Sequence, residues 1–166
     1  MTDQAFTEAV ACNANKGAIE AFGSKFAAKL GYGAGAPLRP IVERLGGRII
    51  YQALDTLGDA SILVYGQGNF EIFLPEDTAP VRDRFSIAHE LGHYVLHFPL
   101  TGQRPMKAYR FGSSRVEWEA NWFAAGFLMP ADEFKTRFSA GLRPIAQHFG
   151  VSMAAAEARA KALGVL

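Results

Sequence analysis

The chain has 166 residues, a length typical of one domain, and 49% of them are hydrophobic while 20% are charged. Such a chain can bury a core and is not intrinsically disordered. Its 17 basic and 16 acidic residues give a formal net charge of +1, which argues against nucleic acid or an anionic membrane as the main partner. The single cysteine, Cys12, excludes an internal disulfide and a multi-cysteine zinc site.

The N-terminus lacks the basic and apolar regions of a signal peptide, and the longest apolar run is far shorter than the roughly 20 residues of a membrane helix. We therefore expect a soluble cytoplasmic protein with a reduced thiol and no membrane partner.

Hydrophobic spacing predicts an N-terminal helix over residues 14–30, followed by a glycine-rich linker over 31–37 and a short helix over 40–45. Alternating apolar residues then predict strands at 48–54, 60–65 and 70–74. Glycines between the last two predict a hairpin turn. The last strand either has a free edge for an extended substrate or lies buried between neighbouring strands.

The remainder of the chain is predicted to be helical. Long helices are expected over 81–97 and 114–129 with a loop over 98–113 between them, and shorter helices follow Pro130, Pro144 and Ser152. The fold class is therefore α+β, with a small antiparallel sheet packed on a helical body.

We divide the chain into three parts. An N-terminal helix and linker occupy residues 1–36, a core occupies 37–130, and a C-terminal helical subdomain occupies 131–166. The subdomain resembles a helix-turn-helix. Its last helix, however, is rich in alanine and has almost nothing with which to contact base edges, so direct binding of nucleic acid is not expected.

One motif dominates the sequence, the run from His89 to His93 with the pattern H-E-x-x-H. Two histidines four residues apart lie one helical turn apart and can bind one metal ion, and Glu90 between them can reach a water molecule at that ion. These residues and His97 share one polar stripe on a helix that is otherwise mostly apolar. The stripe indicates the wall of a cleft.

Catalytic zinc usually takes three protein ligands, so a third one is needed. His97 lies two turns, about 12 Å, from His89 along a straight helix, and we expect it to support the site rather than to bind the metal. The next long helix supplies Glu117 as the expected third ligand, with Glu119 as the alternative. Asn121, one turn after Glu117, could orient a ligand histidine.

The runs RDRFSIAHELGHYVLH (82–97) and EWEANWFAAGFLMP (117–130) resemble the ImmA/IrrE family of zinc metallopeptidases. The resemblance implies a zincin-like core that binds zinc through His89, His93 and Glu117, and a catalytic base at Glu90. It also implies a protein substrate, because similar proteins cleave helix-turn-helix repressors and so derepress genes for stress responses or mobile elements. Some relatives contain a fused DNA-binding domain, for which we expect no room here before the core.

The expected reaction is hydrolysis of a peptide bond with Glu90 as proton acceptor. The donor that stabilises the oxyanion is not determined by the sequence; Tyr109, Arg110 and His97 are candidates. Two histidines and one glutamate would also suit manganese or iron. The alternative function is a zinc-containing module that docks a repressor without efficient cleavage, although binding alone would not require Glu90.

Overall fold

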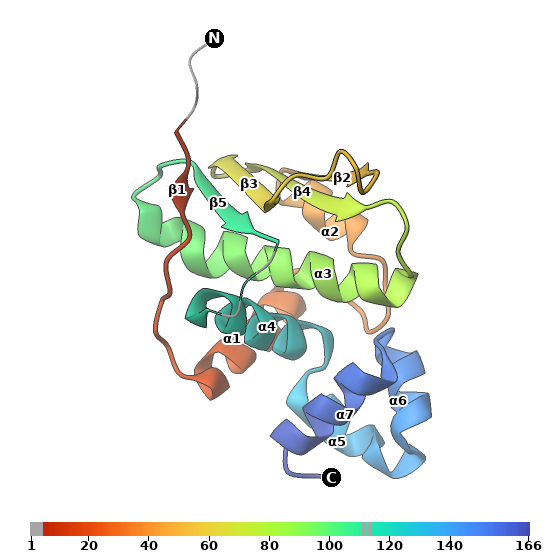
Figure 1. Cartoon of the computed structure of the whole chain (residues 1–166). Helices are drawn as coiled ribbons and strands as arrows, with labels where there is room; N and C mark the ends of the chain where they lie inside the picture. The colour runs from red at the N-terminus through yellow and green to blue at the C-terminus, as the bar shows by residue number, and fades with distance from the viewer. Residues whose placement is uncertain (1–4, 111, 113) are drawn as a thin grey trace.

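The computed structural model describes residues 5–110, 112 and 114–166; residues 1–4 of the expected N-terminal part and residues 111 and 113 of the predicted loop lie outside them. A sheet forms one layer, α3 crosses beneath it, and α4 and α1 form the next layer (Figure 1). The described elements are, in chain order, β1 (Thr7–Glu8), α1 (Lys16–Lys29), α2 (Arg39–Arg44), β2 (Gly47–Gln52), β3 (Ala60–Gly66), β4 (Asn69–Pro75), α3 (Pro80–Gly92), the π-helical turn η1 (His93–His97), the 3-10 turn η2 (Phe98–Thr101), β5 (Met106–Tyr109), α4 (Arg115–Leu128), α5 (Ala131–Arg137), the 3-10 turn η3 (Phe138–Ala140), α6 (Leu142–Phe149) and α7 (Met153–Ala162).

The α+β class with a C-terminal helical region is confirmed, but the expectation of an antiparallel sheet is wrong. The five described strands have the order β1-β5-β3-β4-β2. The central strand β3 is antiparallel to both neighbours, whereas the outer pairs β1–β5 and β2–β4 are parallel. Strand β2 does not pair with β3, which follows it in the chain. Instead, β2 lies on the far side of β4 and runs parallel to it, so the sheet is mixed.

The predicted hairpin is confirmed, since Gly66 of β3 pairs with Asn69 of β4 across a two-residue turn. Because β4 lies between β2 and β3, it has no free edge for a substrate, and the second of the two alternatives holds. The predicted loop over 98–113 is wrong in part, because it contains η2 and the strand β5.

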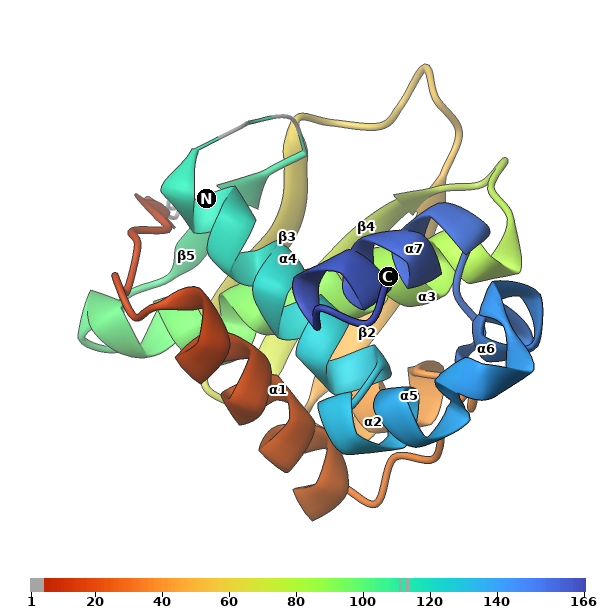
Figure 2. The same ribbon diagram turned by 90° about the horizontal axis from the view of Figure 1, so that it is seen from below.

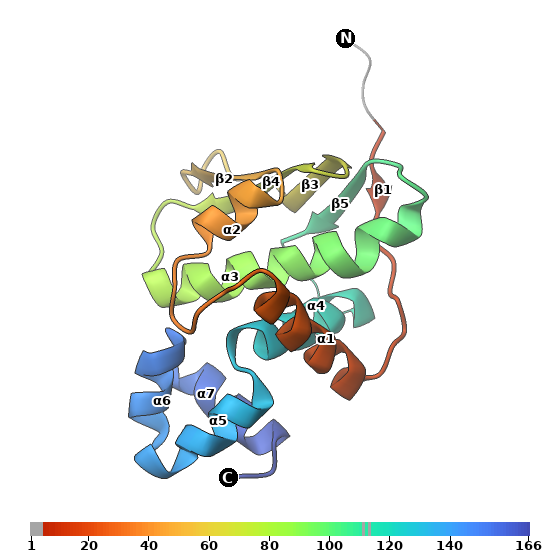
Figure 3. The same cartoon turned by 180° about the vertical axis from the view of Figure 1, so that it is seen from behind.

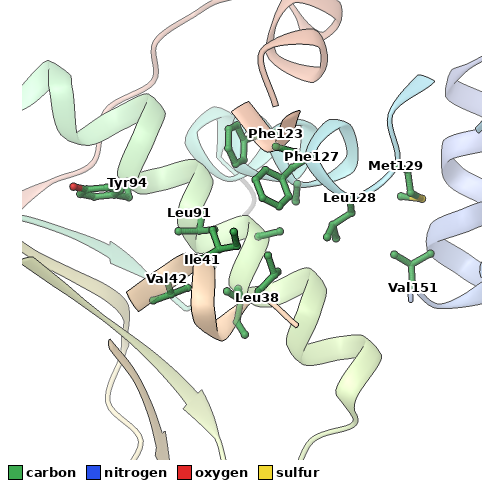
Figure 4. Packing of buried hydrophobic residues seen from close by; sticks show 14 of the residues in the cluster. Leu38, Ile41, Val42, Leu91, Tyr94, Phe123, Phe127, Leu128, Met129 and Val151 are labelled. Carbon is green, nitrogen blue, oxygen red and sulfur yellow. The ribbon is translucent and has the colours of Figure 1, made fainter. Parts of the chain in front are cut away.

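The core lies between the sheet and the two long helices. Leu91 of α3 and Phe123 of α4 are fully buried in it, as is Val42 of α2. Figure 4 shows Val42 nearest the strands, Phe123 among the helices farther from them, and Leu91 between the two. Gly92 allows α3 and α4 to approach closely, because a Cβ atom there would lie only 3.2 Å from the backbone of Ala120.

Helix α1 packs beside α4 in the same layer, so that both lie on the side of α3 away from the sheet, as the views from below and behind show (Figures 2 and 3). Two glycines make this contact close: a Cβ at Gly126 would lie 2.0 Å from the carbonyl oxygen of Glu20, and one at Gly23 would lie 2.5 Å from that of Phe123. Ser24 also donates a hydrogen bond to the carbonyl of Gly126 over 2.8 Å.

The C-terminal helices are joined to this body by Arg159 of α7, which is buried. Its guanidinium donates to the carbonyl of Met129 at the end of α4 (3.0 Å) and pairs with Glu20 of α1 (2.9 Å). A buried arginine needs such partners because an unpaired buried charge is costly. Among the described residues, no helix combines the length and the apolar composition that crossing a bilayer requires.

Candidate metal centre

Helix α3 positions the H-E-x-x-H motif. It begins at Pro80, whose fixed φ and missing N–H suit the first turn of a helix, and Asp83 places a negative charge in that turn. After Gly92 the backbone widens into the π-helical turn η1, which begins at His93 and ends at His97. The predicted single α-helix over 81–97 is therefore one α-helix followed by a π-helical turn.

Three side chains from α3, η1 and α4 form a cluster of potential metal ligands. One donor atom each of His89, His93 and Glu117 lies within 4.8 Å of the other two. The two Glu117 oxygens face the Nε2 atoms of His89 and His93 at 2.8 and 3.2 Å. Asn121 Oδ1 lies 2.7 Å from Nδ1 of His89, the place expected for a residue that orients this ring.

The cluster fits a divalent cation. His93 is fully buried, and its Nε2, 3.2 Å from a Glu117 oxygen, forms no hydrogen bond within the described residues. A buried ring nitrogen and a carboxylate oxygen that face each other without a hydrogen bond are stabilised by a cation between them.

The protonation states fit a cation as well. Burial lowers the pKa of His93 to about 4. Burial raises the pKa of Glu117, but its hydrogen bond with His89 and its close contact with His93 outweigh this effect and lower it to about 2. Both groups are therefore deprotonated at neutral pH, which is the form that binds metal.

Glu90 lies beside the cluster without belonging to it. Glu90 is 5% exposed, and Ser61 of β3 donates a hydrogen bond to its carboxyl over 3.0 Å. Burial raises the pKa of Glu90 to about 7, although the neighbouring charge on His89 and the hydrogen bond from Ser61 oppose the shift. A carboxyl group whose pKa lies near neutral pH is suited to accept and release a proton.

His97 and Glu119 form a second, fully buried pair behind His93. Nδ1 of His97 lies 2.9 Å from Nδ1 of His93, and its Nε2 lies 3.0 Å from Glu119 Oε1. Glu119, the alternative ligand, is thus outside the donor cluster and in contact with His97 instead. The sequence did not suggest this contact.

The structure places the other oxyanion candidates in hydrogen bonds with the protein. The Tyr109 hydroxyl donates to Glu8 of β1 over 2.8 Å. The Arg110 guanidinium donates to the carbonyls of Phe73 and Ala60, each over 3.1 Å, and so links the ends of β4 and β3. Ser61 was not predicted from the sequence, because no local pattern indicates that this strand residue contacts Glu90.

Residues 42–161 match the family model Peptidase_M78, described as the IrrE N-terminal-like domain. The matched segment is more than half of the chain and contains the whole donor cluster together with Glu90. The chain belongs to this metallopeptidase family. The resemblance inferred from the two sequence motifs is confirmed. Among curated proteins, none is significantly similar to the chain.

Proposed function

We propose that this peptidase is a zinc-dependent endopeptidase that cleaves a protein partner. The observation that supports the proposal best is the position of Glu90, a buried carboxyl that contacts Ser61 and lies next to the donor cluster but outside it. A site that only bound a metal would not need a buried acid there, since burying a charge is costly. Catalysis of hydrolysis does need one, as a proton acceptor.

The donor set indicates which residues would bind the ion. His89, His93 and Glu117 would bind zinc, and manganese or iron would fit the same nitrogen and oxygen donors. A bound ion supplies Lewis acidity, which polarises the scissile carbonyl and makes water a better nucleophile. Glu90 takes the proton of the attacking water and passes it to the leaving amine, so that two peptides form without a covalent enzyme intermediate.

A peptide has room to bind beside the cluster. A hollow of about 830 Å³ extends along the first turns of α3 and includes Phe85 and Ser86, which lie one turn before His89. A second hollow of about 290 Å³ shares Phe85 with the first and reaches Asn121. Since Asn121 contacts His89, the second hollow reaches the edge of the donor cluster, and this position supports a substrate that lies along α3.

We further propose that the substrate is a helix-turn-helix transcriptional repressor and that its cleavage derepresses stress or mobile-element genes. Support comes from membership of the IrrE-like family and from the near-neutral charge of the chain, which favours a protein over DNA as the direct partner.

The test is incubation of the zinc-loaded protein with purified candidate repressors, followed by separation of fragments. The wild type should produce two discrete fragments, whereas Glu90→Gln should still bind zinc and the repressor but cleave about 10²–10⁴-fold more slowly. Glu43→Gln, an exposed glutamate of α2, is the matched control and should cleave normally. A repressor that binds and is released from DNA while it stays uncut would show the alternative, a docking module.

A further inference from the structure

A chain of polar contacts leads from the metal cluster into the protein interior. It begins at His93, continues through His97 over 2.9 Å, and ends at Glu119 over a further 3.0 Å. All three side chains are fully buried, with 0% exposure. The H-E-x-x-H motif does not require the last two residues, and neither of them belongs to the donor cluster.

The contacts of Glu119 determine the positions of the protons along this chain. Its carboxylate accepts hydrogen bonds from the backbone N–H groups of Cys12 and Asn13, each over 2.8 Å, and from Arg115 Nε over 3.1 Å. Three N–H donors, one of them on a cationic guanidinium, thus face its two oxygens. A carboxylate in these surroundings is ionised and only accepts hydrogen bonds, so Nε2 of His97 holds the proton of their contact.

The proton on Nε2 determines the remaining contact. The remaining contact joins Nδ1 of His97 to Nδ1 of His93 over 2.9 Å, so one of these nitrogens donates and the other accepts. With its proton on Nε2, a neutral His97 ring accepts at Nδ1, and Nδ1 of His93 is then the donor. A His93 ring protonated on Nδ1 has a free lone pair on Nε2, the atom that faces Glu117.

We infer that His97 and Glu119 are positioning residues that fix the tautomer of His93, so that its Nε2 lone pair is directed at the metal. Outer contacts of this kind hold ligand rings in other metal sites. Here the contact runs through a second histidine, and the π-helical turn η1 contains both rings. The inference rests on the proposed metal site and states which residues fix the tautomer of the ligand His93.

Two of the groups that donate hydrogen bonds to Glu119 lie outside the residues that match the family. Cys12 and Asn13 belong to the segment before α1, whereas the match covers residues 42–161. Asn13 has a left-handed backbone with φ of 62°, a conformation that asparagine adopts more readily than most residues. The N-terminal segment thus supplies two of the donors that keep Glu119 ionised in the interior.

The first test is NMR of the metal-free wild type with ¹⁵N-labelled histidine at neutral pH, because ring ¹⁵N shifts distinguish the two neutral tautomers. His93 should have its proton on Nδ1 and His97 on Nε2. A His93 proton on Nε2 would overturn the inference. This measurement needs neither a bound metal nor a substrate, so its failure is distinct from failure of the proposed peptidase activity.

The second test measures zinc affinity by competition with a chelator. His97→Phe retains a buried ring but removes the acceptor, and we expect about 10–100-fold weaker binding together with loss of the Nδ1-protonated form of His93. Glu119→Gln should act in the same direction, because its amide would place an N–H group against existing donors. His148→Phe, a change in α6 at a histidine that contacts Glu133, is the control and should bind zinc normally. Wild-type affinity in folded His97→Phe and Glu119→Gln would refute the positioning role.

Discussion

Burial of Glu90 next to the donor cluster should make the metal-free protein less stable as the pH rises. The pKa of this carboxyl is about 7 in the folded protein, against an ordinary value of 4.5. Between these values the folded state holds a proton that the unfolded state has released, so the free energy of unfolding falls with pH. The full difference corresponds to about 3 kcal/mol, since one pKa unit is about 1.4 kcal/mol.

Glu90→Gln removes this dependence because glutamine stays neutral at every pH. In urea unfolding of the chelator-treated protein, the variant should exceed the wild type by about 3 kcal/mol at pH 8, but by less than about 1 kcal/mol at pH 5. The exposed control Glu43→Gln should stay within about 0.5 kcal/mol of the wild type at both values. An equal difference at pH 5 and pH 8, or a less stable Glu90→Gln at pH 8, would refute this reasoning.

Three further predictions concern the metal and the helix packing. Glu117→Ala should weaken zinc retention during dialysis against a chelator at least as much as His93→Ala, and by more than the roughly 10–100-fold typical of an outer contact; retention at the wild-type level would exclude Glu117 as a ligand. Burial lowers the pKa of His89, but its hydrogen bond to the Glu117 carboxylate and the charge of Glu90 raise it overall. A proton then competes with the metal, so zinc affinity in a pH titration should rise about tenfold per unit below that pKa and level off above it; an affinity independent of pH would contradict this. Gly126→Ala should lose about 2 kcal/mol in thermal unfolding, because its Cβ meets backbone 2.0 Å away, whereas Gly17→Ala, whose nearest neighbour is 3.6 Å away, should gain up to about 1 kcal/mol.

The sequence predicted the features that depend on short-range periodicity. The two long helices, the hairpin, and the cluster of His89, His93 and Glu117 follow from residues three or four positions apart, combined with one expected helix pairing. The observed elements begin and end within about two residues of most predicted ones. Membership of the peptidase family was recognisable from the same two helices.

The remaining features depend on contacts between distant parts of the chain. Strand β5 has four residues and β1 has two, too short for alternation to be recognised. Strand β5 exists because it pairs with β3 and β1, and β1 exists because it pairs with β5. The antiparallel sheet was expected because neighbouring strands in a sequence usually pair, which β2 and β3 do not. The contact Ser61–Glu90 joins residues 29 positions apart, and the contact Cys12–Glu119 joins residues 107 positions apart. No local sequence pattern indicates either contact.

The packing of α1 shows that the segment that matches the family is shorter than the part of the protein that shares one core. Recognition of the family begins at residue 42, yet Phe123 and Phe127 of α4 are fully buried partly because Phe26 of α1 lies 6.0 and 6.3 Å from them, measured between ring centres. A chain trimmed to the matched residues would expose part of this aromatic surface to water and would also lose the N–H groups that hold Glu119. The unit defined by sequence similarity and the unit defined by cooperative unfolding therefore differ in this protein. Similarity to the family begins at residue 42, but the smallest fragment that unfolds as one unit has to include α1.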